Sequence, residues 1–296
     1  MERKFERKVM NPFLDWSFKY LFATEGSKAN LIGILNVLLS PEPEIVEVDI
    51  MNSESIPVSQ ELKGCVFDIL CKDEAGDQYL IELQNQQMMN EANRIIYYTC
   101  RLIDRMGKRG KEWDYTQIKR VYSICLMNFT YEETPVLRRD VVLYDIIGKK
   151  PFSDKLNIIL LQIPCLKATS IHDCSLKYEF FVYLLKEMNK GMKTIDELKQ
   201  EVAETGLSES TKEIFYKVLD TADVASLSEQ DRMQYESDLK SYRDTMGCIK
   251  FAEMRGEKDG RMNEKLDIAR NMKAKGCSTD LIASCTGLSD AEISEL

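Results

Sequence analysis

The sequence predicts an α/β fold: a mixed central sheet flanked by helices, followed by a region that is entirely helical. Three observations support this prediction. Short runs rich in β-branched and aromatic residues alternate with segments of helical periodicity in the first half of the chain. The strand signal then stops after about Pro164, and only helical segments follow. We therefore expect two domains, residues 1–165 and residues 166–296.

The composition limits the functions that the chain can perform. A net charge of −9 argues against indiscriminate binding of nucleic acid, because such affinity comes largely from Lys and Arg, so any contact with nucleic acid has to be local. His172 is the only histidine, which excludes Ser-His-Asp and Cys-His catalysis and histidine-ligated zinc. Carboxylates acting with a metal ion remain as the apparatus of a hydrolase.

The sequence also suggests where the protein works. The first ten residues are charged and have no apolar core, so they do not resemble a secretory signal. The longest apolar stretches, residues 31–39 and 158–163, are too short to span a bilayer. Nine cysteines without a C-x-x-C spacing fit reduced thiols. We expect a cytoplasmic protein with no membrane partner.

Two helices and a strand are expected before residue 51. Apolar residues recur at helical spacing over residues 15–22. Ser27 is placed to cap a second helix through Leu38, which the prolines after residue 40 terminate. Residues 45–50 alternate as a strand would, with the apolar side chains of Val46, Val48 and Ile50 on one face.

The remaining elements follow the same reasoning. Residues 88–106 are expected to form a long amphipathic helix. Further strands are expected at residues 118–127, 141–147 and 156–163. The C-terminal helices are expected at residues 178–188, 195–202, 212–224 and 232–272. The tail resembles a short helix-turn-helix, but the acidic residues of its last helix favour a packing or oligomer-contact role over DNA reading.

Residues 62–87 predict the hairpin around which the rest is organised. Strands are expected at residues 65–71 and 78–83, joined by a turn in which Gly76 is free to take a positive φ. If Lys72 pairs with Gln78, then Asp68 lies opposite Glu82, and Gln84 projects from the same side as Glu82. Two facing carboxylates about 5 Å apart repel each other, and a divalent cation would relieve the repulsion. An exposed hairpin with one solvated face is the alternative.

At this point the sequence resembles a known family. Phe67-Asp68-Ile69, followed after a turn by Ile81-Glu82-Leu83-Gln84, resembles the metal-site hairpin of the PD-(D/E)XK nuclease superfamily. More narrowly, it resembles the branch called PD-(D/E)XK nuclease family transposases, or recombination-promoting nucleases. Three other features match that branch: the entry segment from Asn11 to Phe22, the Arg94, Tyr97, Tyr98 cluster, and a Gly-Leu-Ser helix near the C-terminus.

The resemblance implies a function and a site. It implies a restriction-endonuclease-like core and a metal-dependent DNA endonuclease associated with recombination or transposition, acting as a homo-oligomer such as a dimer. Asp68 and Glu82 would hold Mg²⁺ or Mn²⁺. Gln84 stands where the superfamily usually has Lys, so its neutral amide can orient a water but cannot neutralise charge. A non-catalytic module that binds nucleic acid or protein is the alternative function.

The remaining candidates each have an alternative role. Asp15 and Lys19, one turn apart, would complete the metal site and contact a phosphate, or would form a plain surface ion pair. Arg94 would approach a phosphate, while Tyr97 and Tyr98 are expected to be core or rim aromatics. A basic patch is expected to contact the DNA backbone, or to be a solvated helix end. Its members are Arg101, Arg105, Lys108, Arg109 and Lys111.

Overall fold

The computed structural model describes residues 8–40, 44–51, 54–55, 65–66, 68–107, 113–131 and 135–296. The chain divides into two compact units, Met1–Asp238 and Leu239–Leu296. The first unit has a mixed sheet flanked by helices, and only helices follow the last strand, so the predicted fold class is confirmed. Among the described residues, no helix combines the length and apolar character needed to cross a membrane.

A six-stranded sheet forms the centre of the first unit. Its strands lie in the order β1, β4, β5, β6, β10, β7. The pairs β5–β6 and β6–β10 are parallel and the other neighbours are antiparallel. The bounds are β1 Val48–Ile50, β4 Ile69–Asp73, β5 Gln78–Gln84, β6 Val121–Met127, β7 Arg138–Val142 and β10 Leu156–Gln162. Two small antiparallel pairs are separate: β2 (Glu54–Ser55) with β3 (Cys65–Val66), and β8 (Tyr144–Asp145) with β9 (Lys150–Pro151).

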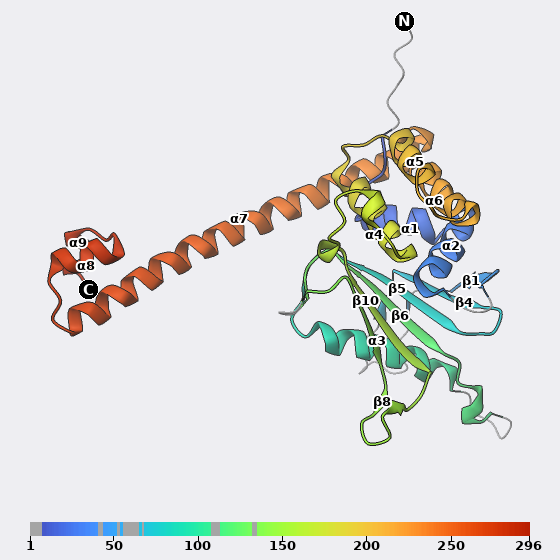
Figure 1. Cartoon of the computed structure of the whole chain (residues 1–296), viewed down its shortest axis with the longest axis horizontal. Coiled ribbons are helices and arrows are strands. Elements are labelled where there is room, and N and C mark those ends of the chain that lie inside the picture. Colours follow the sequence, from blue (N-terminus) through green and yellow to red (C-terminus); the bar gives the residue numbers. More distant parts are fainter. Residues whose placement is uncertain are drawn as a thin grey trace, which may run out of the picture. The chain divides into compact units, whose positions relative to one another are not determined.

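Helices cover both faces of this sheet (Figure 1). One face carries α3 (Glu91–Met106). The other side carries α1 (Asp15–Phe22), α2 (Lys28–Leu39), α4 (Lys177–Lys190), α5 (Ile195–Ala203) and α6 (Glu209–Thr221). Short 3₁₀ turns lie at Glu25–Ser27, Tyr115–Gln117, Ile163–Cys165, Ile171–Asp173 and Val224–Ser226.

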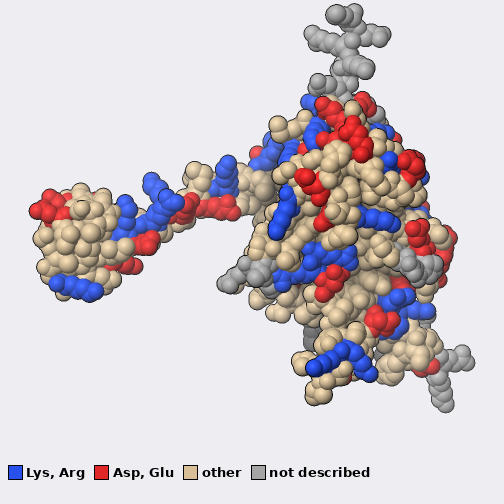
Figure 2. All heavy atoms as spheres, viewed as in Figure 1, with Lys and Arg blue, Asp and Glu red and all other residues tan. Residues whose placement is uncertain are grey.

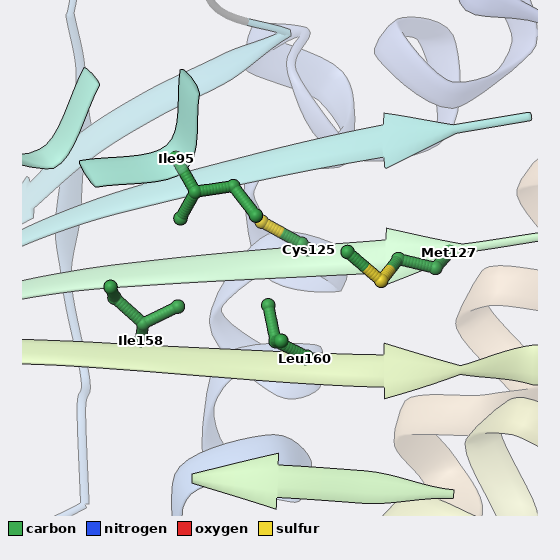
Figure 3. Packing of buried hydrophobic residues seen from close by; sticks show 5 residues of the cluster. All are labelled: Ile95, Cys125, Met127, Ile158 and Leu160. Carbon is green, nitrogen blue, oxygen red and sulfur yellow. The ribbon is translucent and has the colours of Figure 1, made fainter. Parts of the chain in front are cut away.

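Two apolar clusters attach α3 to the sheet. Ile95 packs with buried residues of β6 and β10, four of them drawn with it in Figure 3: Cys125, Met127, Ile158 and Leu160. Leu102, two turns further along α3, packs with Leu70, Leu80 and Val121. Each such buried side chain contributes about 1.5–3 kcal/mol. Because β6 runs from Val121 to Met127, α3 runs antiparallel to it, and the first turn of α3 lies near the C-terminal end of β5.

The helices after residue 165 pack on those before the sheet. The rings of Phe22 and Phe181 meet edge to face with centroids 6.3 Å apart. Asn30 Nδ2 donates to Thr221 Oγ1 at 2.9 Å. The change from strands to helices at residue 165 therefore falls inside the first compact unit. The division of the chain into domains at that residue stays a prediction.

The strand expected at residues 45–50 is shorter than predicted. Only Val48–Ile50 pairs, with β4. Asn36 explains the difference, because its side chain donates to the Ile45 carbonyl at 2.8 Å and accepts from the Ile45 amide at 2.9 Å. Val46 is exposed as a result, so the predicted grouping of Val46 with Val48 and Ile50 was wrong.

Two other predicted strands are each divided. The run at residues 65–71 splits between β3 and β4, and Phe67 lies outside the described residues. The run at residues 141–147 splits between β7, which begins earlier at Arg138, and the separate strand β8. Ser27 precedes α2 as expected but does not cap it, because its hydroxyl is bonded to Thr24.

The helix α7 (Glu229–Ala274) begins in the first unit and continues into the second. The second unit ends with α8 (Thr279–Thr286) and α9 (Asp290–Ser294). These two helices pack on the last turns of α7 through the buried residues Ala269, Ile282, Leu288 and Ile293. Gly276 and Gly287 end helices with positive φ, and Ser289 and Glu292 form a capping box.

Candidate active site

The register of the central hairpin is the predicted one. Lys72 pairs with Gln78 and the ladder continues to Ile69 and Ile81. Gly76 has a φ of +84° in the turn. Asp68 immediately precedes β4, and its Oδ2 accepts a hydrogen bond from the Leu83 amide at 2.8 Å. This bond holds Asp68 beside the C-terminal part of β5, next to the residue that the register places opposite it.

Glu82 and Gln84 lie on the face of β5 that α3 covers. They pair in register with Cys125 and Met127 of β6, both buried. Glu82 is 3% exposed and Gln84 is 4% exposed. The alternative of a hairpin with one solvated face therefore does not describe this strand. A carboxylate in this position has lost most of its hydration and needs a charged or hydrogen-bonding partner.

Arg94 supplies part of that compensation. Its Nη2 lies 3.3 Å from Glu82 Oε2, and Gln84 Nε2 donates to the same oxygen at 3.5 Å. Burial nevertheless raises the pKa of Glu82 to about 7; Arg94 opposes this shift and Asp68 adds to it. Burial also raises the pKa of Asp68, against the hydrogen bond from the Leu83 amide. The two carboxyl groups thus lie where a further cation would stabilise their charged forms.

The oxygen atoms fit such a cation. Glu82 Oε1 and Gln84 Oε1 are both buried, and in the described part of the chain neither has a hydrogen-bond partner. Hard oxygen ligands of this kind are what Mg²⁺ and Mn²⁺ prefer. Across the described residues, no group of three or more His, Cys, Asp or Glu side chains is arranged to hold a metal ion. The protein would therefore supply few ligands, leaving positions for water and phosphate.

Asp15 and Lys19 form the predicted ion pair at the edge of this site. Lys19 Nζ lies 2.9 Å from Asp15 Oδ1, and both side chains reach solvent. They line the same hollow as Asp68, together with Trp16 and Tyr20. Their charges also act on Asp68, whose pKa the Asp15 carboxylate raises and Lys19 lowers. The ion pair is therefore exposed to solvent, as a surface pair would be, and it also lies next to Asp68.

Sequence reasoning missed one carboxylate of this site. Glu91 begins α3 and is 2% exposed, and its charge adds to the rise in the pKa of Glu82. Its Oε2 accepts from the Met88 amide at 3.3 Å, and its Oε1 lies 3.9 Å from Arg94 Nη1. The sequence feature that could have identified Glu91 was its spacing of three residues from Arg94 on the predicted helix. An acidic residue at a helix N-terminus is, however, already explained by the helix dipole.

The predicted basic patch is only partly described. Arg101 is largely buried and pairs with Asp104 at 2.9 Å. Arg105 is exposed in the last turn of α3. Lys108, Arg109 and Lys111 lie outside the described residues. The ring of Tyr98 lies under the Arg94 guanidinium at 5.2 Å, which makes Tyr98 a neighbour of the site rather than an open stacking platform.

A comparison with known protein families gives a match over most of the chain. The model of a family described as PD-(D/E)XK nuclease family transposase matches residues 12–252, which include the hairpin, α3 and the helices packed on α2. No curated protein matches the chain, and no solved structure does.

Proposed function

Because the chain belongs to the PD-(D/E)XK nuclease family transposases, we propose that it is a metal-dependent DNA endonuclease that hydrolyses phosphodiester bonds in recombination or transposition. One observation carries the proposal. Asp68 is bonded to the strand that holds Glu82, and burial raises the pKa of both carboxyl groups while oxygens of Glu82 and Gln84 stay without partners in the described part of the chain. This arrangement suits cation binding better than it suits a structural core.

Each residue has a distinct role in this proposal. Asp68 and Glu82 would hold Mg²⁺ or Mn²⁺, with Gln84 Oε1 as a further oxygen donor. When bound, such an ion polarises the scissile phosphate and lowers the pKa of a coordinated water. The Gln84 amide orients that water or a phosphate oxygen. Arg94, which is paired with Glu82, and Lys19, at the edge of the hollow, would contact phosphates.

The DNA would extend from this site along α3. Arg105 lies at the far end of that helix, and Lys108, Arg109 and Lys111 follow it in the sequence. Contacts of this kind position the backbone without reading sequence. A homodimer would bring two such sites to the two strands of a duplex.

Plasmid nicking tests the proposal. The wild type should cut supercoiled DNA with Mg²⁺ and not with excess chelator. Asp68→Ala and Glu82→Ala should each abolish cutting, because each removes an oxygen ligand. Glu74→Ala, an exposed carboxylate in the turn of the same hairpin, is the matched control and should cut like the wild type. Full activity of either site variant would contradict the assignment.

A non-catalytic binding module is the second candidate. Two observations favour it: a neutral Gln84 where the superfamily usually has Lys, and an Arg94 guanidinium already bound to Glu82. If no protein of the series cuts DNA under any metal, while the wild type binds DNA in a gel-shift assay, this function replaces the first.

A further inference from the structure

The hairpin β8–β9 exposes more apolar surface than its fold requires. It follows β7, the edge strand, and a bond from the Phe152 amide to the Leu143 carbonyl at 2.9 Å closes the base of the hairpin. Ile146 and Ile147 in its turn are 83% and 95% exposed, and Phe152 is 78% exposed. Several highly exposed apolar side chains on one short hairpin favour an interaction site.

The turn itself does not need these isoleucines. Asp145 Oδ1 accepts hydrogen bonds from the amides of Ile147, at 3.0 Å, and Gly148, at 2.9 Å. A Cβ at position 148 would collide with the Asp145 carboxylate, and Lys149 has a φ of +51°. Asp145 and Gly148 therefore build the turn. Turns favour Asn, Asp, Gly and Ser, so two β-branched residues at its tip oppose the local preference.

Positive charge accompanies the apolar tip. Lys149 and Lys150 are exposed, and no ion pair joins either to an acidic residue in the described ranges. The neighbouring Asp145 is occupied by the turn amides. Figure 2 shows Lys and Arg atoms gathered around tan surface at the β8–β9 end of the first unit. In a chain of net charge −9, this local combination favours an anionic partner.

The hairpin lies at the same end of the sheet as the basic end of α3. β7 runs antiparallel to β10 and its last residue, Val142, lies opposite Asn157 near the start of β10. The first residues of β10, β6 and β5 lie side by side at this end of the sheet, because Leu156 pairs with Val121 and Val121 pairs with Gln78. Arg105 lines a hollow with Gln78. Glu82 lies four residues along β5, about 13 Å, and a helical turn of B-DNA is about 34 Å. A duplex bound at Glu82 and along α3 would thus reach the hairpin within about one turn.

We propose that the β8–β9 hairpin is a DNA wedge: Ile146 and Ile147 enter the minor groove and part a base step, while Lys149 and Lys150 contact the flanking phosphates. Apolar wedges with flanking cations are a recurrent means of kinking duplex DNA. A second copy of the chain fits less well, because the paired lysines would face themselves across a two-fold axis. The proposal rests on the proposed nuclease function, since that function supplies the duplex.

The test uses the full chain in chelator, so that no DNA is cut. A duplex containing 2-aminopurine reports unstacking as a rise in fluorescence. The wild type should raise this signal, and the double variant Ile146→Ser, Ile147→Ser should lose it and bind several-fold more weakly. Met192→Ser, another highly exposed apolar residue, is the control and should leave both unchanged. Circular dichroism verifies that each variant is folded.

Salt dependence tests the two lysines. Lys149→Gln with Lys150→Gln should flatten the slope of log affinity against log salt by about two, roughly 0.9 for each phosphate that is no longer neutralised. Lys167→Gln with Lys177→Gln, two exposed lysines outside both the hairpin and α3, is the control and should change the slope little.

Three results would overturn the wedge. The first is DNA binding by the wild type without any rise in 2-aminopurine fluorescence. The second is a serine variant that binds and unstacks DNA as the wild type does but loses a dimer in light scattering, which would assign the surface to a second copy. The third is binding to anionic vesicles that the serine variant alone loses. None of these results would affect the nicking assay, in which the wild type cuts DNA with Mg²⁺ and Glu82→Ala does not. Failure of the wedge and failure of the nuclease function are therefore distinguishable.

Discussion

At the scale of single residues, Glu82 shows how a site conflicts with the stability of the fold that contains it. The side chain is buried against β6 and α3, and the Arg94 guanidinium at 3.3 Å does not offset the lost hydration. The pKa of Glu82 is therefore raised from 4.5 to about 7. Between pH 4.5 and about 7, Glu82 therefore keeps its proton in the folded chain but has lost it in the unfolded chain. The free energy of unfolding falls as the pH rises through this window.

Glu82→Gln should remove this pH dependence. At about 1.4 kcal/mol per pKa unit, the shift corresponds to about 3 kcal/mol, so without metal the variant should be more stable than the wild type at pH 8 and similar to it at pH 4. The amide oxygen of the variant still accepts from Arg94. Urea unfolding of both proteins over this pH range measures the difference. Parallel stability curves would show that Glu82 titrates normally.

The same variant separates stability from cation binding. Mg²⁺ should raise the melting temperature of the wild type at pH 8, because an ion that binds only the folded chain stabilises it. It should not raise that of Glu82→Gln, which lacks the charged ligand. An equal shift in both proteins would place the ion elsewhere.

Gln84 provides a second prediction at this scale. Its amide lies beside Glu82 and can orient a water or a phosphate oxygen without neutralising charge. Gln84→Ala should lower the single-turnover cleavage rate, and loss of one oriented donor costs on the order of 3 kcal/mol in such sites. Gln84→Lys should raise the rate if the ammonium fits the pocket. A Gln84→Ala protein that cuts as fast as the wild type, while the Asp68 and Glu82 variants are inactive, would exclude Gln84 from the reaction.

At the scale of elements, α3 links the site to the proposed path of the DNA. Its first turn holds Glu91 and Arg94 beside Glu82, and its last turn carries Arg105 at the other end of the sheet. Ile95 and Leu102 fix it on the strands between. A helix held at both ends in this way keeps the catalytic and backbone contacts at a constant separation.

Charge removal at the end of α3 tests this role. Replacing Arg105, Lys108 and Arg109 by Gln should weaken binding to all DNA sequences alike and flatten the salt slope by about 0.9 for each phosphate that these side chains neutralise in the wild type. The Lys167, Lys177 double variant again serves as the control. An unchanged slope would mean that these residues form only a solvated helix end.

At the scale of the whole molecule, the sheet and the helices after residue 165 share one core. Three contacts join residues before that position to residues after it. They are the Phe22–Phe181 ring contact, the Asn30–Thr221 hydrogen bond and the bond from the Met10 amide to the Ala222 carbonyl, at 2.8 Å. The second unit has its own small core around Ala269 and Ile282.

Truncation tests where the chain divides. A protein ending at Lys240 keeps Asp238, whose carboxylate accepts from the Trp16 amide at 3.2 Å, and should unfold cooperatively at a temperature close to that of the whole chain. A protein ending at residue 165 should be unfolded or aggregated, because it exposes the faces of α1 and α2 that α4 and α6 cover. Cooperative unfolding of the shorter protein would instead support the predicted domain boundary.

By itself the sequence determined the long helices and the central hairpin. Strand alternation and turn chemistry predicted the Lys72–Gln78 register, because side chains alternate strictly along a strand, and helical periodicity predicted the long helices. It also identified Asp68, Glu82 and Gln84 as neighbours. Only the tertiary structure decided what surrounds them. Burial under α3 raises the pKa of Glu82, Arg94 and Glu91 join it from another element, and Asn36 shortens β1 through a contact nine residues away. These outcomes depend on which surfaces lose water and which charges meet, and no local pattern encodes either.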